Sequence, residues 1–266
     1  VVRHRHTGKI YVKKYVAKEL LPNYLRVQKI CDHRIEKIYT CAEDTDRLIV
    51  ITEYISGTTL QEYIEDHGPL PERRACAIIE DLLQILQKIH REGIVHRDIT
   101  PSNVMLTNDG VTKLIDFNIA RQKKRAQGTD TTILGTAGYA APEQLYGKTG
   151  KEEWGHQNGN ERRDTFGTGF GIGADERSDI YTLGATLYHM LTGHDPARPP
   201  YGIRPVRSMK PELTADMERI VGKCTEEAPE KRYQTVEALK ADLEKRKFSG
   251  RKRRNPYPLW KLEKKI

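Results

Sequence analysis

The spacing of apolar side chains changes about 55 residues into the chain, and it predicts two regions of different structure. Before that point, β-branched and aromatic residues gather in short runs typical of strands. We place these strands at residues 1–7, 9–16, 34–42 and 47–55, with a weak helix over 18–30. The first two strands would form a hairpin around the turn sequence HTGK. We therefore expect residues 1–55 to fold as a small, mostly antiparallel β lobe with one helix.

From residue 57 onward the apolar positions follow the helical period of about 3.6 residues. The stretch 178–192 is apolar nearly all round, which predicts a helix that is buried on every side. Two short strands, at 104–106 and 111–117, flank a TNDG turn. Helices are expected at 71–91, 178–192, 213–224 and 234–245. The second lobe, 57–246, is therefore expected to be mainly helical.

One stretch of the second lobe, 147–173, fits neither pattern. It is glycine-rich, polar and aperiodic, and we interpret it as a surface insertion. Its FGTGFGIG sequence imitates a phosphate-binding loop, but the strict G-x-G-x-x-G spacing fails because the sixth positions are Ile172 and Ala174. We therefore expect no role in nucleotide binding for this stretch.

Charge is distributed unevenly along the 266 residues, whose net charge is +8. Residues 245–266 hold ten Lys and Arg against one Glu, which leaves 35 basic and 36 acidic residues in 1–244. The basicity therefore belongs to a C-terminal tail, which we place at 247–266, and it does not argue for nucleic-acid binding by the body. The tail alone would contact an anionic membrane or nucleic acid, or remain solvated.

The remaining composition limits the class of protein. The length is sufficient for a sizeable core, and the composition excludes a collagen, a coiled coil and a wholly disordered chain. No apolar run reaches the roughly 18–20 residues that cross a bilayer. The four cysteines form no CxxC pair, so we interpret them as free thiols and expect a reducing, cytoplasmic location. They stand at Cys31, Cys41, Cys76 and Cys224.

The sequence HRDITPSN, from His96 to Asn103, carries the sharpest chemical signal. Asp98 can accept a proton, and Asn103 can bind a hard cation through its amide oxygen. Asp116 follows a predicted strand 13 residues beyond Asn103 and offers a carboxylate for a second metal contact. Phosphoryl transfer from a nucleotide needs this combination, since a base orients the attacking hydroxyl and oxygen ligands hold Mg²⁺ against the phosphates.

With these motifs the chain resembles the catalytic domain of eukaryotic-type (Hanks-type) Ser/Thr protein kinases from residue 2 to about 246. The motif sequences HRDITPSN, DFNIAR and GYAAPEQ resemble those of bacterial members of the family more than those of animal members, and particularly those of Gram-positive bacteria. The resemblance implies an α+β, bilobal fold in a kinase domain over 1–246, with an N-lobe at 1–55 and a C-lobe at 57–246. It also implies transfer of the γ-phosphate of ATP to protein hydroxyls, with Mg²⁺ as the metal.

The resemblance further implies which residues bind the nucleotide. Lys14, six residues after the turn glycine, would neutralise α- and β-phosphate oxygens. The sequence VITEYISG would connect the lobes, with Thr52 behind the adenine and the backbones of Glu53 and Ile55 bonded to its edge. Met105 would lie beneath the adenine ring. Asn103 and Asp116 would be the metal ligands.

Three supporting contacts are implied as well. Thr136, in GTAGYAAPEQ, would hydrogen-bond near Asp98. Glu143 would form a buried ion pair with Arg232, which serves the architecture of the lobe. Asp179, in SDIYTLG, would brace the catalytic loop through the backbone amides of that loop.

The chain also departs from the family pattern. The glycine-rich loop over the phosphates is missing, so we expect a truncated N-lobe that lacks its first strand. The family places a helix Glu beside the phosphate-binding lysine, but counting back from the DHR turn gives Tyr24 or Leu25, and the nearest acid is Glu19. Thr100 stands where a lysine is usual, and Asn118 makes the DFG motif DFN.

These departures leave alternative functions open. An active kinase acting on protein substrates is favoured by the intact Asp98, Asn103 and Asp116. A pseudokinase or scaffold is favoured by the missing loop and helix Glu. A third reading, a membrane or nucleic-acid binder driven by the tail, depends on the basic cluster alone. With Tyr257 and Trp260 among its cations, that tail suits the inner face of an anionic plasma membrane.

Overall fold

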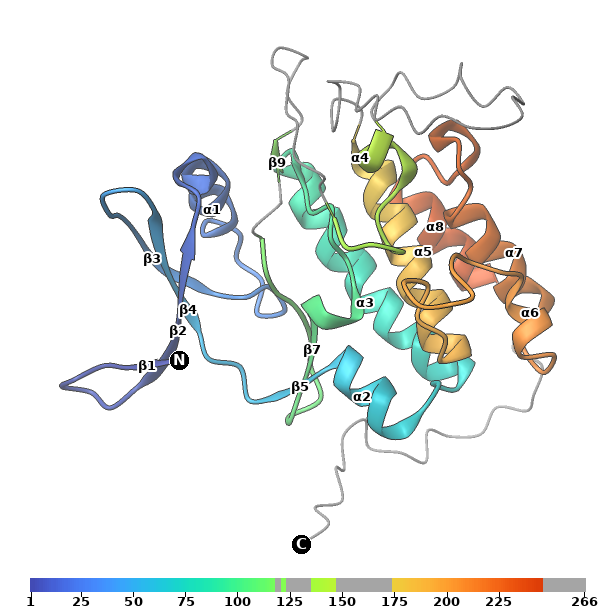
Figure 1. The fold of residues 1–266 in the computed structure, drawn as a ribbon, viewed down its shortest axis with the longest axis horizontal. Coiled ribbons are helices and arrows are strands. Elements are labelled where there is room, and N and C mark those ends of the chain that lie inside the picture. Colours follow the sequence, from blue (N-terminus) through green and yellow to red (C-terminus); the bar gives the residue numbers. More distant parts are fainter. Residues whose placement is uncertain (118–120, 123–134, 147–173, 246–266) are drawn as a thin grey trace, which may run out of the picture.

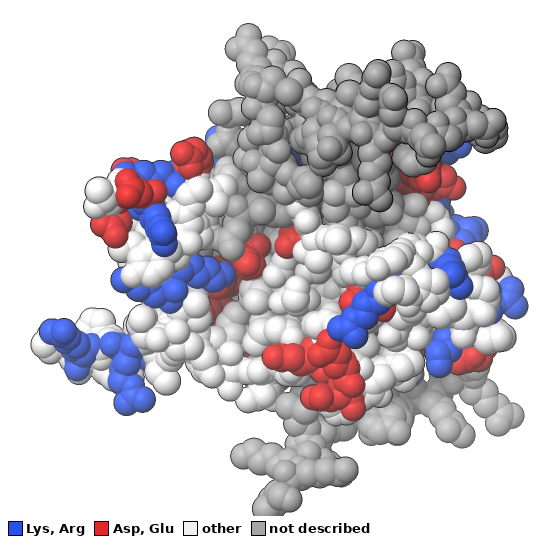
Figure 2. Space-filling view, in the orientation of Figure 1, with Lys and Arg blue, Asp and Glu red and all other residues white. Residues whose placement is uncertain are grey.

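The computed structural model describes residues 1–117, 121–122, 135–146 and 174–245. These residues form a small β lobe and a larger helical lobe (Figure 1), so the predicted two-lobed α+β architecture is confirmed. The insertion at 147–173, Asn118 and the basic tail at 247–266 lie outside the described residues. On the face shown in Figure 2, cations and anions occur on both lobes, as expected for the near-neutral body.

The small lobe contains a four-stranded antiparallel sheet in the order β1-β2-β4-β3. Its strands are β1 (Val2–Arg3), β2 (Ile10–Val16), β3 (Ile38–Glu43) and β4 (Leu48–Glu53). The predicted strand at 34–42 begins only at Ile38, because residues 34–36 bond instead to the end of a strand in the large lobe. The predicted helix at 18–30 is a 3₁₀ turn, Lys18–Leu20, followed by the short helix α1 (Leu21–Val27).

A small core holds this lobe together. Tyr24 and Val27 of α1 are buried, as are Leu48 and Val50 of β4. The central strand pairing is β2 with β4, where Lys14 lies opposite Val50. Because successive side chains of a strand point to opposite faces, Val12, Lys14 and Val16 share one face of β2.

The large lobe begins with a second sheet of three strands, in the order β5-β7-β8. These are β5 (Gly57–Thr59), β7 (Val104–Thr107) and β8 (Thr112–Leu114). The predicted strands at 104–106 and 111–117 are thus present, the second in shortened form. A Cβ at Gly57 would overlap the backbone of Leu106, so glycine permits β5 to approach β7. Two further short strands, β6 (Ile94–Val95) and β9 (Arg121–Gln122), pair with each other.

The helices of the large lobe are α2 (Leu60–His67), α3 (Glu72–Arg91), α4 (Pro142–Tyr146), α5 (Glu176–Thr192), α6 (Val206–Met209), α7 (Ala215–Cys224) and α8 (Val236–Lys245). Four of them, α3, α5, α7 and α8, follow the sequence prediction within a few residues at each end, whereas α2, α4 and α6 were not predicted. As predicted, α5 is buried along nearly its whole length, and it contacts α3 and α7. A Cβ at Gly184 would overlap the side chain of Cys224, so glycine allows α5 and α7 to pack closely. Within the described part of the chain, no helix has the length and apolarity needed to cross a membrane.

Candidate active site

The loop between β6 and the 3₁₀ turn Pro101–Asn103 presents Asp98 near the junction of the lobes. One carboxylate oxygen of Asp98 accepts hydrogen bonds from the Thr136 hydroxyl at 2.7 Å and the Thr136 amide at 3.1 Å. The other accepts from Asn103 Nδ2 at 2.7 Å. The predicted contact of Thr136 with Asp98 is confirmed, and both oxygens of the carboxylate are held in fixed directions.

Asp179 of α5 supports this loop from below. It is fully buried and accepts hydrogen bonds from the backbone N–H groups of His96 at 2.9 Å and Arg97 at 2.6 Å. His90 Nε2 lies 2.7 Å from the same carboxylate. Burial alone would raise the pKa of Asp179, but the hydrogen bond and charge of His90, together with His96 and the Arg97 N–H, outweigh it and lower that pKa. The predicted bracing is confirmed, and it keeps Arg97 in a left-handed conformation with φ of 70°.

Asn103 directly precedes β7, and Asp116 stands two residues after the end of the neighbouring strand β8. The Ile115 N–H donates to the Asn103 carbonyl at 2.9 Å, which places the residue before Asp116 directly beside Asn103. Asp116 has φ of 65° and a side chain that is 32% exposed. The next residue, Phe117, is buried, and its ring packs edge-to-face against the ring of His96, with 4.8 Å between the ring centroids. Asn103 and Asp116 thus offer one amide oxygen and one carboxylate as ligands for a metal ion. Among the described residues, no group of three or more His, Cys, Asp or Glu side chains is arranged to bind a metal by itself.

Lys14 of β2 points toward the same region from the small lobe. Its Nζ lies 3.0 Å from Glu36 Oε2 and 3.8 Å from Asp116 Oδ1. The family pattern points to the α1 positions Tyr24 and Leu25, with Glu19 as the nearest acid, so the sequence analysis does not identify Glu36. No local pattern singles out Glu36, because it stands inside a run that predicts a strand.

The residues predicted to surround adenine come from both lobes. Thr52 is fully buried at the end of β4, and its hydroxyl has no hydrogen-bond partner among the described residues. The Glu53 N–H donates to the Lys37 carbonyl at 2.9 Å, so a contact of Glu53 with adenine would use the carbonyl oxygen. Ile55, between the lobes, and Met105, on β7, are half-buried. Their contacts with a nucleotide remain a prediction.

Thr100 replaces the lysine that is usual two residues after the catalytic aspartate. Its side chain is 1% exposed, and its hydroxyl lies 2.9 Å from the hydroxyl of Ser102. A buried neutral hydroxyl cannot supply a positive charge near a γ-phosphate. Any such charge in this chain must come from another group.

Two buried side chains tie α4 to the end of the large lobe. Arg232 donates to Glu143 through Nη1 at 2.7 Å and Nη2 at 2.8 Å. Glu143 also accepts from the Ser178 hydroxyl at 2.6 Å. The predicted Glu143–Arg232 ion pair is therefore confirmed.

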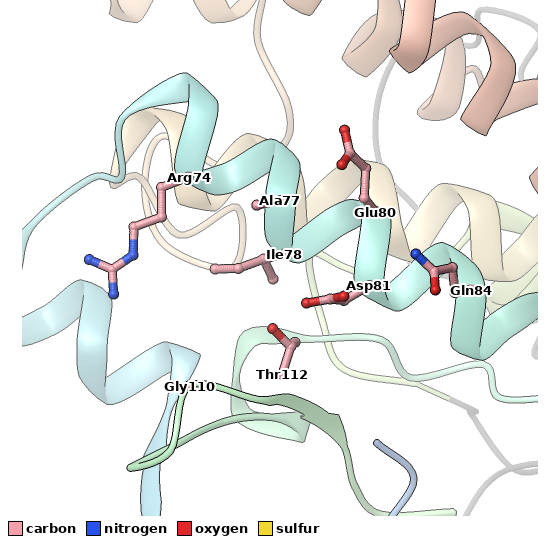
Figure 3. A pocket seen from close by; sticks show the side chains of 8 residues that line it. All are labelled: Arg74, Ala77, Ile78, Glu80, Asp81, Gln84, Gly110 and Thr112. Carbon is pink, nitrogen blue, oxygen red and sulfur yellow. The ribbon is translucent and has the colours of Figure 1, made fainter. Parts of the chain in front are cut away.

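A separate pocket lies on one side of α3, against the turn between β7 and β8 (Figure 3). It has a volume of about 220 Å³. Its lining residues are Arg74, Ala77, Ile78, Glu80, Asp81, Gln84, Gly110 and Thr112. None of the predicted site residues is among them, so this pocket is distinct from the catalytic cluster.

Comparison with known proteins agrees with this geometry. The family model described as "Protein kinase domain" matches residues 1–243, and the chain belongs to this family. The Ser/Thr-protein kinase PknB of Mycolicibacterium smegmatis is 32% identical over 208 residues, which cover 73% of this chain and 29% of PknB. The Ser/Thr-protein kinase PknL of Mycobacterium tuberculosis is 31% identical over 233 residues, covering 82% of this chain and 52% of PknL. The predicted resemblance to bacterial kinases is confirmed, and the chain spans less than a third of the PknB relatives that it matches.

Proposed function

We propose that this chain is the catalytic domain of a Ser/Thr protein kinase that transfers the γ-phosphate of ATP to protein hydroxyls. The observation that carries this proposal is the convergence of Asp98, Asn103, Asp116 and Lys14 where the lobes meet. The family membership and the names of the relatives support the same activity.

Asp98 would orient the attacking hydroxyl and accept its proton. Thr136 and Asn103 each donate a hydrogen bond to a different oxygen of its carboxylate and so fix the orientation of the group. Since Asp179 holds the loop backbone beneath Asp98, the carboxylate would need little rearrangement when a substrate hydroxyl arrives.

Asn103 and Asp116 would hold Mg²⁺ through oxygen atoms, which are the ligands that this ion prefers. The Asn103 amide nitrogen already donates to Asp98, which leaves the amide oxygen as the atom that would face the cation. Two protein ligands suit a magnesium site that is completed by nucleotide phosphates. When bound, the ion would neutralise charge on those phosphates. Lys14, within 3.8 Å of Asp116, would bind the phosphate oxygens beside it.

The adenine would lie between the lobes. Thr52 would line the back of this site, where its hydroxyl lacks a partner in the described structure, and Met105 would form its floor. The backbone groups of Glu53 and Ile55 would provide the hydrogen bonds to the adenine edge.

A pseudokinase or scaffold is the second candidate function, and the buried, neutral Thr100 is the observation that favours it. The variant Asp98→Asn separates the two functions, because the amide keeps the size of the side chain but cannot accept a proton. We expect autophosphorylation and phosphorylation of a general protein substrate to fall by about 10²–10⁴, with an unchanged melting temperature. Asp66→Asn, at an exposed position of α2, is the matched control and should retain full activity. Equal phosphoryl transfer by Asp98→Asn and the parent protein would remove the kinase assignment.

A further inference from the structure

Helix α1 has no carboxylate to offer to the phosphate-binding lysine. Its sequence, LPNYLRV, contains no acidic residue. The one acidic residue just before it, Glu19, is exposed on the preceding 3₁₀ turn. In protein kinases generally, a glutamate on this helix pairs with the lysine, and the position of the helix controls activity. This chain must build the pair differently or do without it.

Glu36 forms that pair from another element. It lies between α1 and β3, and only 4% of its surface is exposed. One oxygen, Oε2, accepts from Lys14 Nζ at 3.0 Å and from the Asp116 N–H at 3.2 Å. A single carboxylate oxygen thus contacts both the lysine and the backbone of the predicted metal ligand.

The backbone of Glu36 is fixed by the large lobe. Its N–H donates to the Leu114 carbonyl at 3.0 Å, and the Leu114 N–H donates to the Arg34 carbonyl at 2.8 Å. Between them, Ile35 forms a parallel β-bridge with Leu114. Leu114 is the last residue of β8, two positions before Asp116. Glu36 and Asp116 are therefore held in register by backbone bonds, independently of α1.

Tyr24 is one of the two α1 positions, with Leu25, at which the family pattern places the glutamate. It is fully buried, and burial together with the negative charges of Asp116 and Glu36 raises the pKa of its hydroxyl. A neutral ring therefore fills the space beside the two carboxylates. The pair of Glu36 with Lys14 is not an incidental surface contact, since a carboxylate buried to this extent without a cation would be strongly destabilising.

We propose that Glu36 is the positioning residue for Lys14, in place of a glutamate on α1. The proposal depends on the proposed kinase function, in which Lys14 binds phosphate. Because Glu36 is bonded to the end of β8, the lysine, its carboxylate and Asp116 form one assembled unit. Movement of α1 therefore does not switch this pair on or off.

The test compares Glu36→Gln with Glu19→Gln in the whole chain. Glu36→Gln should lower kcat/KM for ATP at least tenfold, and weaken binding of Mg²⁺–ATP measured by displacement of a fluorescent nucleotide. The KM for the protein substrate should be unchanged, which separates a positioning role at the nucleotide from a general structural defect. Glu36→Asp keeps the charge with one methylene less and should recover part of the loss. Glu19→Gln should match the parent protein.

If Glu36→Gln melts early, Glu36→Asp keeps the test decisive, because it retains the buried negative charge but moves it away from Lys14 by one methylene. Glu36→Asp should melt close to the parent protein and still bind Mg²⁺–ATP more weakly than the parent. Equal Mg²⁺–ATP binding by Glu36→Gln and the parent overturns the proposal, as does loss of binding in Glu19→Gln alone. A parent protein that binds Mg²⁺–ATP without transferring phosphate would contradict the kinase function. In that case the comparison of Mg²⁺–ATP binding between Glu36→Gln and the parent would still test the role of Glu36 in positioning Lys14.

Discussion

Replacement of Arg232 by methionine removes the cation from a buried ion pair while keeping an unbranched side chain of similar length. The guanidinium is 0% exposed and donates to both oxygens of Glu143. It also donates to three backbone carbonyls, those of Glu226 at 2.7 Å, Glu227 at 2.9 Å and Arg177 at 3.1 Å. The variant would therefore remove the donor from four acceptor groups, the Glu143 carboxylate and the three carbonyls.

The size of the effect follows from what remains behind. Glu143 is 9% exposed and would be a buried carboxylate that keeps the hydrogen bond from the Ser178 hydroxyl but has lost its cation. Removal of one member of a buried ion pair costs about 3–5 kcal/mol, because the other charge stays uncompensated. That is a large fraction of the roughly 5–15 kcal/mol that stabilises a typical domain. With a urea slope of about 3 kcal/mol per molar, the unfolding midpoint should fall by about 1–1.7 M.

The chain contains a matched control for this measurement. Arg219 also makes two bonds to one carboxylate, to Asp242 at 2.6 Å and 3.1 Å, but its side chain is 50% exposed. Water solvates both groups after the change, so Arg219→Met should cost about 1 kcal/mol or less. Urea unfolding of the three proteins, followed by far-ultraviolet circular dichroism at one pH, gives the comparison. Equal losses in the two variants would refute the argument from burial, and so would a loss below 1 kcal/mol in Arg232→Met.

Two further predictions concern pH and the tail. Burial lowers the pKa of His189 from 6.5 to about 4, so between these pH values the unfolded chain binds a proton that the folded chain does not. The contribution of His189 to the free energy of unfolding should therefore fall by about 3 kcal/mol as the pH drops from 6.5 to 4. The variant His189→Gln should show a correspondingly weaker dependence of the free energy of unfolding on pH. The control variant His6→Gln, at an exposed position, should keep the dependence of the parent protein. The tail at 247–266 should bind vesicles of anionic lipid at low salt. Sedimentation with such vesicles should be lost when the tail is removed, and equal sedimentation of full-length and shortened protein would contradict a membrane role.

The features that were predictable from the sequence depend on local spacing. The all-round apolar run at 178–192 could only be a buried helix, and α5 has that environment. Asp98 and Asn103 are five residues apart in one loop, so their contact follows from the chain between them. The partnership of Glu143 with Arg232 joins distant residues, and it was accessible only through the resemblance to the kinase family.

The features that sequence reasoning missed arise from pairing between distant segments. Residues 34–36 belong to the run 34–42 that predicts a strand, but they bond to Leu114 in the other lobe and not to the sheet beside them. Glu36 acquires its position from that pairing, so no count along the helix could identify it. The sequence predicts no strand at Gly57–Thr59, yet β7 provides the partner that makes this segment the strand β5.

The pairing of residues 34–36 with Leu114 also limits how the two lobes can move. The lobes are joined by the continuous chain at residues 54–56 and, separately, by the backbone bonds of Arg34 and Glu36. Two bodies joined at two separate points keep one easy rotation, about the line through those points. Glu36 lies at one of the points, whereas β1 is at the sheet edge opposite β3 (Figure 1). A rotation that moves the lobes apart about this line should therefore carry β1 furthest and leave the bond between Glu36 and the Asp116 N–H intact.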